Sequence, residues 1–163
     1  MIRRLVVISA AIFVFSQATP AFADATAFIG MQTNPDRQAM RGLAGGVSLV
    51  IVGFEGEYAS SGEDESAGLP SLTTFSGNVF LQTPVPIFGT KFYATTGVGV
   101  YRERQDAIDH QETNLVYNTG GGAKVNLIGP LHVRLDYRVL KLRGEPVRPS
   151  TVHRLYAGIT LAF

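Results

Sequence analysis

The sequence has 163 residues, no cysteine, no tryptophan and a formal net charge of +1. This length fits a single domain with a short extension. The absence of cysteine excludes a disulfide framework, cysteine-ligated zinc, iron–sulfur chemistry and cysteine catalysis, and the near-zero charge argues against a nucleic-acid-binding protein.

The first 23 residues have the three parts of a secretory signal peptide. Arg3 and Arg4 provide a basic start, Leu5–Phe15 is a largely apolar run, and Ala21 and Ala23 match the small residues of a cleavage site. As a helix, the apolar run reaches about half of the way across a hydrocarbon core. We therefore expect cleavage after Ala23 rather than an N-terminal anchor, and no transmembrane helix further along the chain.

Residues 24–163 alternate between apolar and polar side chains, which is typical of β-strands with two different faces. The alternation is weaker in the first two segments, where Gly and Ala blur the contrast. No segment carries an apolar stripe with a period of 3.6 residues, so we predict no helix in this domain. The predicted strands are Ala25–Gln32, Arg41–Leu49, Val50–Ser60, Ser71–Gln82, Lys91–Glu103, Asn114–Leu127, Leu131–Leu142 and Val152–Phe163.

The connections between these segments alternate in character. Short turns rich in apolar residues, Pro and Gly are expected at Ser48–Ile51, Pro84–Gly89 and Gly129–Pro130. Longer polar loops are expected at Thr33–Gln38, Gly62–Pro70, Arg104–Glu112 and Gly144–Thr151. This arrangement indicates an eight-stranded antiparallel up-and-down barrel whose two ends face different compartments.

The polar face of the strands is rich in Gly, thinly charged and of mixed sign, which suits a narrow interior better than water. An eight-stranded barrel has an interior that side chains can fill. We expect a lumen closed by ion pairs, with Glu55 and Glu57 near Arg134 and Arg138. The predicted lumen charge network comprises Glu55, Glu57, Glu103, Lys124, Arg134, Asp136, Arg138 and Arg154.

The C-terminal residues Tyr156, Gly158, Leu161 and Phe163 resemble the C-terminal assembly signal of bacterial outer-membrane proteins. Together with the alternating segments, they make residues 24–163 similar to the small outer-membrane β-barrel proteins of the OmpA/OmpX type. The resemblance implies a transmembrane barrel in a Gram-negative envelope, inserted by the barrel-assembly machinery, with no further periplasmic domain. Because an open sheet edge in lipid leaves backbone groups unpaired, the first strand is expected to pair with the last.

The histidines offer few candidates for chemistry. His110 lies among Asp106, Asp109 and Glu112, a cluster that could hold a divalent cation but matches no zinc or calcium motif. His132 is expected at the periplasmic end of the lumen. On the lipid face, His153 could serve a lipid-modifying enzyme with Ser150 or Thr151, but no acidic residue nearby clearly completes a triad.

Other features have structural interpretations. The run Gly120–Gly122 precedes no helix, so it is expected to relieve crowding rather than to bind phosphate. Tyr58, Tyr117 and Tyr137 are plausible members of the aromatic girdles. Two long loops carry an excess of acidic residues, which makes the exposed rim acidic.

The sequence therefore predicts a monomeric integral outer-membrane barrel with a structural or surface-interaction role. No enzymatic centre, cofactor or metal is expected, and its partners are outer-membrane lipid and, during insertion, the assembly machinery. The alternatives are a lipid-modifying barrel enzyme, a narrow pore and a soluble periplasmic ligand-binding barrel.

Overall fold

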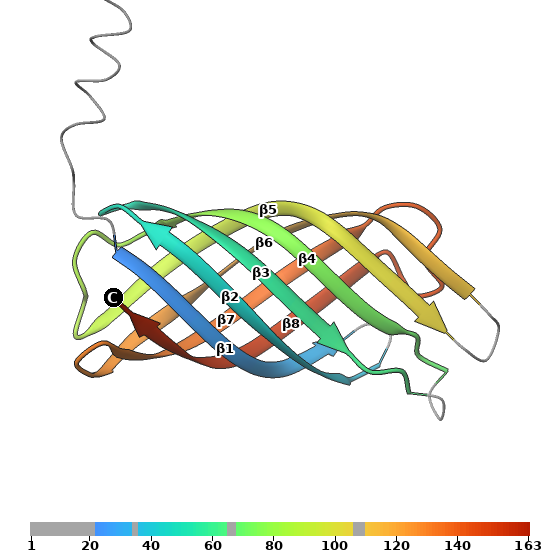
Figure 1. Ribbon diagram of the computed structural model, residues 1–163, viewed down its shortest axis with the longest axis horizontal. Helices are drawn as coiled ribbons and strands as arrows, with labels where there is room; N and C mark the ends of the chain where they lie inside the picture. Colours follow the sequence, from blue (N-terminus) through green and yellow to red (C-terminus); the bar gives the residue numbers. More distant parts are fainter. Residues whose placement is uncertain (1–21, 34–35, 65–67, 106–109) are drawn as a thin grey trace, which may run out of the picture.

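The computed structural model describes residues 22–33, 36–64, 68–105 and 110–163. These residues form a closed barrel of eight antiparallel strands, in which each strand pairs with its neighbours in sequence and β8 pairs with β1 (Figure 1). The strands are β1 (Phe22–Thr33), β2 (Gln38–Ser48), β3 (Val52–Ser61), β4 (Ser71–Gln82), β5 (Thr90–Gln105), β6 (His110–Ile128), β7 (Leu131–Leu142) and β8 (Thr151–Ala162). The predicted all-β barrel fold is confirmed.

The two ends of the barrel differ. The end on the left of Figure 1, here called the turn end, carries the short connections 49–51, 83–89 and 129–130 and the C-terminus. The opposite end is called the loop end. Among the described residues there is no helix of the length and apolar character needed to cross a membrane.

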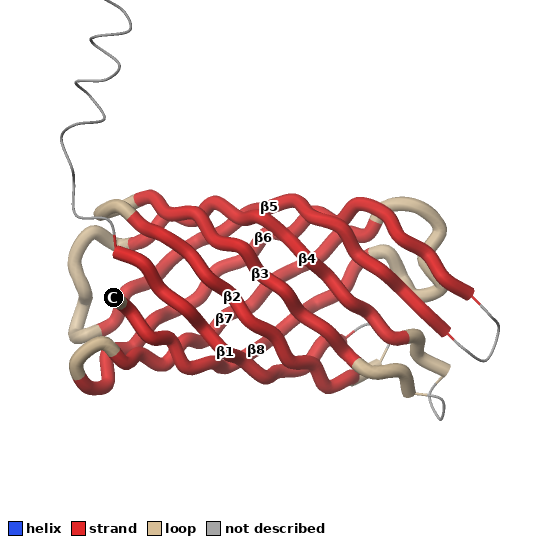
Figure 2. Tube along the Cα trace, in the orientation of Figure 1, coloured by secondary structure: helices blue, strands red, loops and turns tan. Residues whose placement is uncertain are grey.

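One predicted loop is wrong. Residues 104–112 were expected to be a loop, but β5 continues to Gln105 and β6 starts at His110, with Arg104 paired to Gln111 and Gln105 to His110. The two strands are 16 and 19 residues long, and their hairpin projects beyond the other strands at the loop end (Figure 2). Because the hairpin pairs its own backbone, polar residues that suggest a loop can remain in strand conformation.

The first strand begins before the predicted cleavage point. Ala23 exchanges backbone hydrogen bonds of 2.9 Å with Phe163, so both residues take part in closing the barrel. Cleavage after Ala23 stays a prediction, and processing there would remove this pair of bonds.

The apolar faces of the strands point outward. Leu43, Phe75 and Leu155 remain 62%, 60% and 55% exposed, and many other large apolar side chains share this outer surface. A soluble protein rarely exposes so extensive a continuous apolar surface. The exterior is therefore suited to contact with lipid, and the polar faces line the lumen.

The lumen also contains apolar residues that the alternation pattern did not identify. One cluster of buried side chains lies between the centre of the barrel and the loop end, and consists of Leu72, Tyr101, Val116, Leu140, Leu142 and Val152. A second cluster includes Phe28, whose ring stacks on Tyr156 with 4.1 Å between centroids. Gly42 makes room for this stack, since a Cβ at that position would lie 2.3 Å from the tip of the Phe28 ring.

Candidate functional site

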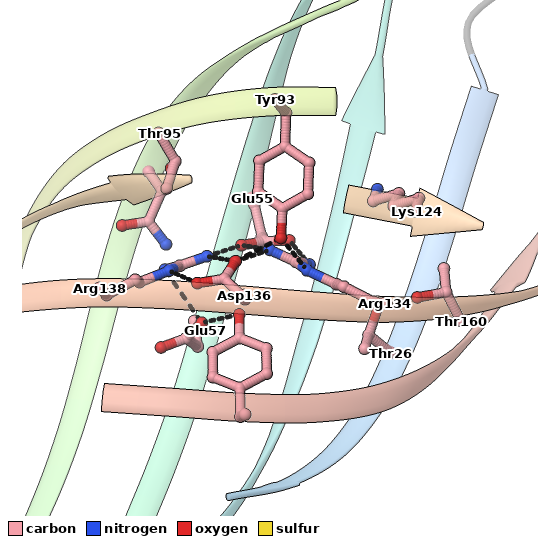
Figure 3. Close-up of polar contacts among 12 residues, drawn as sticks. Thr26, Glu55, Glu57, Tyr93, Thr95, Lys124, Arg134, Asp136, Arg138 and Thr160 are labelled. Atoms are coloured by element: carbon pink, nitrogen blue, oxygen red, sulfur yellow. Dashed lines mark hydrogen bonds and ion pairs between the residues drawn. The ribbon is translucent and has the colours of Figure 1, made fainter. Parts of the chain in front are cut away.

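The centre of the lumen is crossed by ion pairs between β3 and β7, which lie on opposite sides of the barrel (Figure 3). Arg134 pairs with Glu55 and, at 2.9 Å, with Asp136. Arg138 lies 2.8 Å from Glu55, 2.9 Å from Glu57 and 3.0 Å from Asp136. The four residues that the sequence placed near one another, together with Asp136, form one cluster that we call the central network.

Arg154 on β8 completes the central network. Its guanidinium donates to Thr74 Oγ1 at 2.9 Å and lies 3.7 Å from Glu57. All six charged side chains of the central network are almost fully buried. The three guanidinium groups and the three carboxylates balance in charge, as a buried cluster requires.

Two tyrosines that sequence reasoning did not assign to this network hold it in place. Tyr93 donates to Asp136 and accepts a 2.7 Å hydrogen bond from Arg134 Nε. Tyr156, which the sequence assigns to the C-terminal assembly signal, donates to Glu57 at 3.0 Å. Both tyrosines lie at positions where the alternation of side chains along the strand predicts an inward direction. This alternation was the signal in the sequence that indicated their location.

The glycine run on β6 fits around this arrangement. A Cβ on Gly122 would lie 2.6 Å from the Tyr93 hydroxyl oxygen, and one on Gly120 would lie 2.1 Å from the Tyr137 carbonyl oxygen. The run therefore leaves room for neighbouring strands and for Tyr93, in keeping with the expected relief of crowding.

Lys124 and Glu103 lie outside the central network. Lys124 is directed to the turn end, where its ammonium group pairs with Asp24 and lies 5.3 Å from the Phe80 ring centroid. Glu103 lies toward the loop end and pairs with Arg148 at 2.8 Å. The network predicted as one cluster is therefore divided into three groups along the barrel.

The β7–β8 loop, residues 143–150, closes the loop end of the lumen. Arg148 is buried there, and its guanidinium donates to Glu103 and to the Pro70 carbonyl oxygen. Glu103 also accepts a 2.8 Å hydrogen bond from the Val147 backbone N–H. Burial lowers the pKa of Arg148, and the Glu103 carboxylate opposes this shift by favouring the charged guanidinium.

Arg148→Ala is expected to loosen this loop. Loss of hydrogen bonds to a charged group costs about 1.5–3 kcal/mol, which corresponds to about a tenfold or larger rise in local opening. Limited trypsin digestion of the refolded barrel should then cleave after Arg143 correspondingly faster. Val147→Ala, at an exposed position that keeps its backbone donor, is the matched control. Equal digestion rates for wild type and Arg148→Ala would show that the ion pair does not hold the loop.

In the candidate metal cluster, Asp106 and Asp109 lie outside the described residues. Glu112 accepts hydrogen bonds from the Tyr101 hydroxyl at 3.1 Å and from the Glu145 backbone N–H at 2.8 Å. Within the described ranges, no group of three or more His, Cys, Asp or Glu side chains is arranged to hold a metal ion.

The other two histidines lie at the ends of the barrel. His132 borders the mouth of the lumen at the turn end, in a cavity shared with Lys91 and Lys124. His153 Nδ1 lies 2.7 Å from the Tyr137 hydroxyl on the outer surface. The hydroxyl groups of Ser150 and Thr151 lie 3.0 and 3.1 Å from Lys141 Nζ. These contacts are not the hydroxyl–imidazole–carboxylate arrangement that activates a nucleophile.

Comparison with known proteins agrees with this architecture. No protein-family model matches the sequence, and no curated protein matches it either. Among solved structures, Neisserial surface protein A (NspA) aligns with a TM-score of 0.69 and 12% identity, covering 88% of this chain and 97% of NspA. The N-terminal β-barrel domain of Pseudomonas aeruginosa OprF aligns with a TM-score of 0.65 and 14% identity, covering 87% and 97%.

Ail, the attachment invasion locus protein of Yersinia pestis, aligns with a TM-score of 0.56 and 12% identity, covering 88% of this chain and 98% of Ail. At these identities the likeness concerns the fold alone. The chain has the fold of the small eight-stranded bacterial outer-membrane barrels.

Proposed function

We propose that this chain is an integral outer-membrane barrel with a structural or surface-interaction role, a closed lumen and no catalytic centre. The observation that carries this proposal is the combination of an apolar exterior with a lumen blocked by buried ion pairs. Lipid can cover the exterior, while buried ion pairs between β3 and β7 occupy the centre of the lumen.

The direction of the two faces supports a membrane barrel over a soluble one. In a soluble ligand-binding barrel, the apolar face would surround the ligand and the charged face would meet water. Here Arg134, Arg138 and Arg154 are buried in the lumen, whereas Phe54 and Leu135 are half-exposed on the outside. This arrangement favours lipid as the solvent of the outer surface.

Three features of the lumen support a closed barrel over a pore. The central network spans the interior from β3 to β7. Toward the loop end, the apolar cluster around Leu140 and Leu142 forms a second barrier, and the Arg148 loop contact a third. An ion crossing this path would have to lose its hydration at each barrier.

Reconstitution into planar bilayers tests the closed lumen. The wild-type barrel is expected to give no reproducible single-channel steps. Leu140→Ser and Leu142→Ser, combined with Arg148→Ala, should remove two barriers and still leave conductance low, because the central network remains. Regular open-channel steps in the wild type would favour the narrow-pore alternative.

The outer surface does not favour a catalytic role. His153 contacts Tyr137, and Ser150 contacts Lys141, so the candidate groups of a lipid-modifying enzyme do not form a relay. A deacylase assay on the purified barrel and on His153→Ala tests this alternative. Deacylation by the wild type that is lost in the variant would establish an enzyme.

Insertion by the barrel-assembly machinery is part of the same proposal. Leu161 on β8 and Phe163, which directly follows β8, are exposed, and a machinery that reads the C-terminal residues could reach them. Tyr156 instead points into the lumen, where it stacks on Phe28. The barrel is proposed to act as a monomer.

A further inference from the structure

On β2–β6, the outward-facing residues change from apolar to polar between two successive rows of residues that are paired across the strands. One row of residues that are paired across neighbouring strands is apolar or aromatic: Leu43, Tyr58, Phe75, Val100 and Leu115. The next row toward the loop end carries hydroxyl or basic side chains: Arg41, Ser60, Thr73, Arg102 and Thr113. This second row, here called the basic row, contains no carboxylate.

Because the strands of a barrel are tilted, a row of paired residues changes depth from strand to strand. Arg41 is the fourth residue of β2 and lies near the loop end, where we place the boundary between hydrocarbon and headgroups. Apolar side chains suit the acyl region, while guanidinium groups and hydroxyls suit the interface where phosphates lie. Arg41 and Arg102 are both exposed, so they are accessible from the outer surface. Between them, the hydroxyl groups of Ser60 and Thr73 lie 3.1 Å apart and share a hydrogen bond.

An apolar groove opens on the outer surface directly beside Arg41. Its volume is about 1000 Å³, and its lining includes Ile29, Ala39, Leu155, Ala157 and Arg41. Arg41 pairs with Ile29 in the sheet, and Ile29 pairs with Ala157, so the basic side chain lies in line with the groove. Because the side chains of Ala39 and Ala157 are small, a groove remains between the larger side chains around them.

We propose that this groove and Arg41 form a site for one phosphorylated lipid of the outer leaflet. An acyl chain lies along Ile29, Leu155 and Ala157, and a headgroup phosphate lies against Arg41. A guanidinium group binds phosphate by two parallel hydrogen bonds, which a lysine does not reproduce. The inference rests on the proposed outer-membrane location.

Arg102 lies three strands away from Arg41, roughly 14 Å along the sheet at the usual spacing of neighbouring strands. Because the strands are tilted, the two guanidinium groups lie at different depths, and Arg102 does not line the groove. The phosphate contact is therefore assigned to Arg41, and the preferred ligand is a lipid with a phosphorylated headgroup.

The test uses the refolded barrel in phosphatidylcholine nanodiscs that contain a small fraction of bisphosphorylated lipid A or of the same lipid A without phosphates. Native mass spectrometry then counts the lipid A molecules that each barrel retains. Wild type should retain the phosphorylated form about tenfold better, and Arg41→Ala should lose most of that preference. Ala157→Leu should lower retention of both forms, because leucine fills the groove.

Lys91→Ala, at the turn end, controls for loss of a positive charge, and Ala94→Leu controls for a larger side chain elsewhere on the outer surface. Each variant must first show a folded band on an unboiled gel. Equal retention of the two lipids by wild type, or an unchanged preference in Arg41→Ala, would overturn the inference. Loss of the preference on adding inorganic phosphate alone would overturn it too, because the site would then bind free phosphate.

These results are separable from failure of the proposed function. A barrel that resides in the outer membrane but shows no lipid preference contradicts only the lipid site. A barrel found outside the outer membrane contradicts the proposed function, whatever lipid it retains in nanodiscs.

Discussion

Arg138→Ala is expected to lower the free energy of unfolding of the refolded barrel by about 3–5 kcal/mol. The substitution leaves Glu55, Glu57 and Asp136 buried without one of the cations that compensate them. Uncompensated buried charge is costly, so the effect exceeds that of losing a surface ion pair.

Urea unfolding followed by circular dichroism measures this loss, since the chain has no tryptophan for fluorescence. Arg102→Ala, which removes an exposed arginine from the outer surface of β5, is the matched control and should change stability by less than about 0.5 kcal/mol. If Arg138→Ala were as stable as Arg102→Ala, the central network would not be a main contributor to the closed barrel.

Leu135→Arg is expected to cost about 2–4 kcal/mol when the barrel is folded into lipid. Leu135 lies in the middle of the outward-facing residues along β7 and is half-exposed. An arginine at that depth must leave its charge in hydrocarbon or distort the bilayer to reach the interface.

Thr73→Arg is the paired variant, because Thr73 is the third residue of β4 and lies close to the loop end of the barrel. Its cost should be only about 0–1 kcal/mol. Equilibrium folding titrations into lipid vesicles measure both values. Equal costs at the two positions, or higher stability of Leu135→Arg, would contradict lipid contact at Leu135.

The sequence was sufficient to predict the fold because most strands follow the same simple alternation of apolar and polar side chains. On β7, Leu131 to Val139 alternate with His132 to Arg138, and the structure places the apolar set outside and the charged set inside. Such alternation is a local property, and the closure of β1 on β8 follows from the need to pair every backbone group in lipid.

The grouping of the charges could not be predicted in full. Parity shows that Glu103 and Lys124 face inward, but it does not give their height along the barrel relative to Arg134. That height depends on the register between strands. The register pairs Lys124 on β6 with Arg134 on β7, and Asp24 is the counter-ion of Lys124. Register is a long-range property that a single alternating segment does not determine.

Arg148 was missed for a different reason. It belongs to a connection with no periodicity, and a charged loop residue is usually solvated. Its burial results from a fold of the loop over Glu103, which only the three-dimensional arrangement shows. The apolar residues Leu140 and Leu142 were missed because they occupy inward positions that the membrane-barrel pattern normally fills with polar side chains.

Fractionation of the producing cell, followed by an unboiled and a boiled gel of the membrane fraction, tests the central claim most directly. A closed barrel in the outer membrane should appear in that fraction and migrate differently before and after boiling. A soluble periplasmic protein whose migration does not change on boiling would contradict the account.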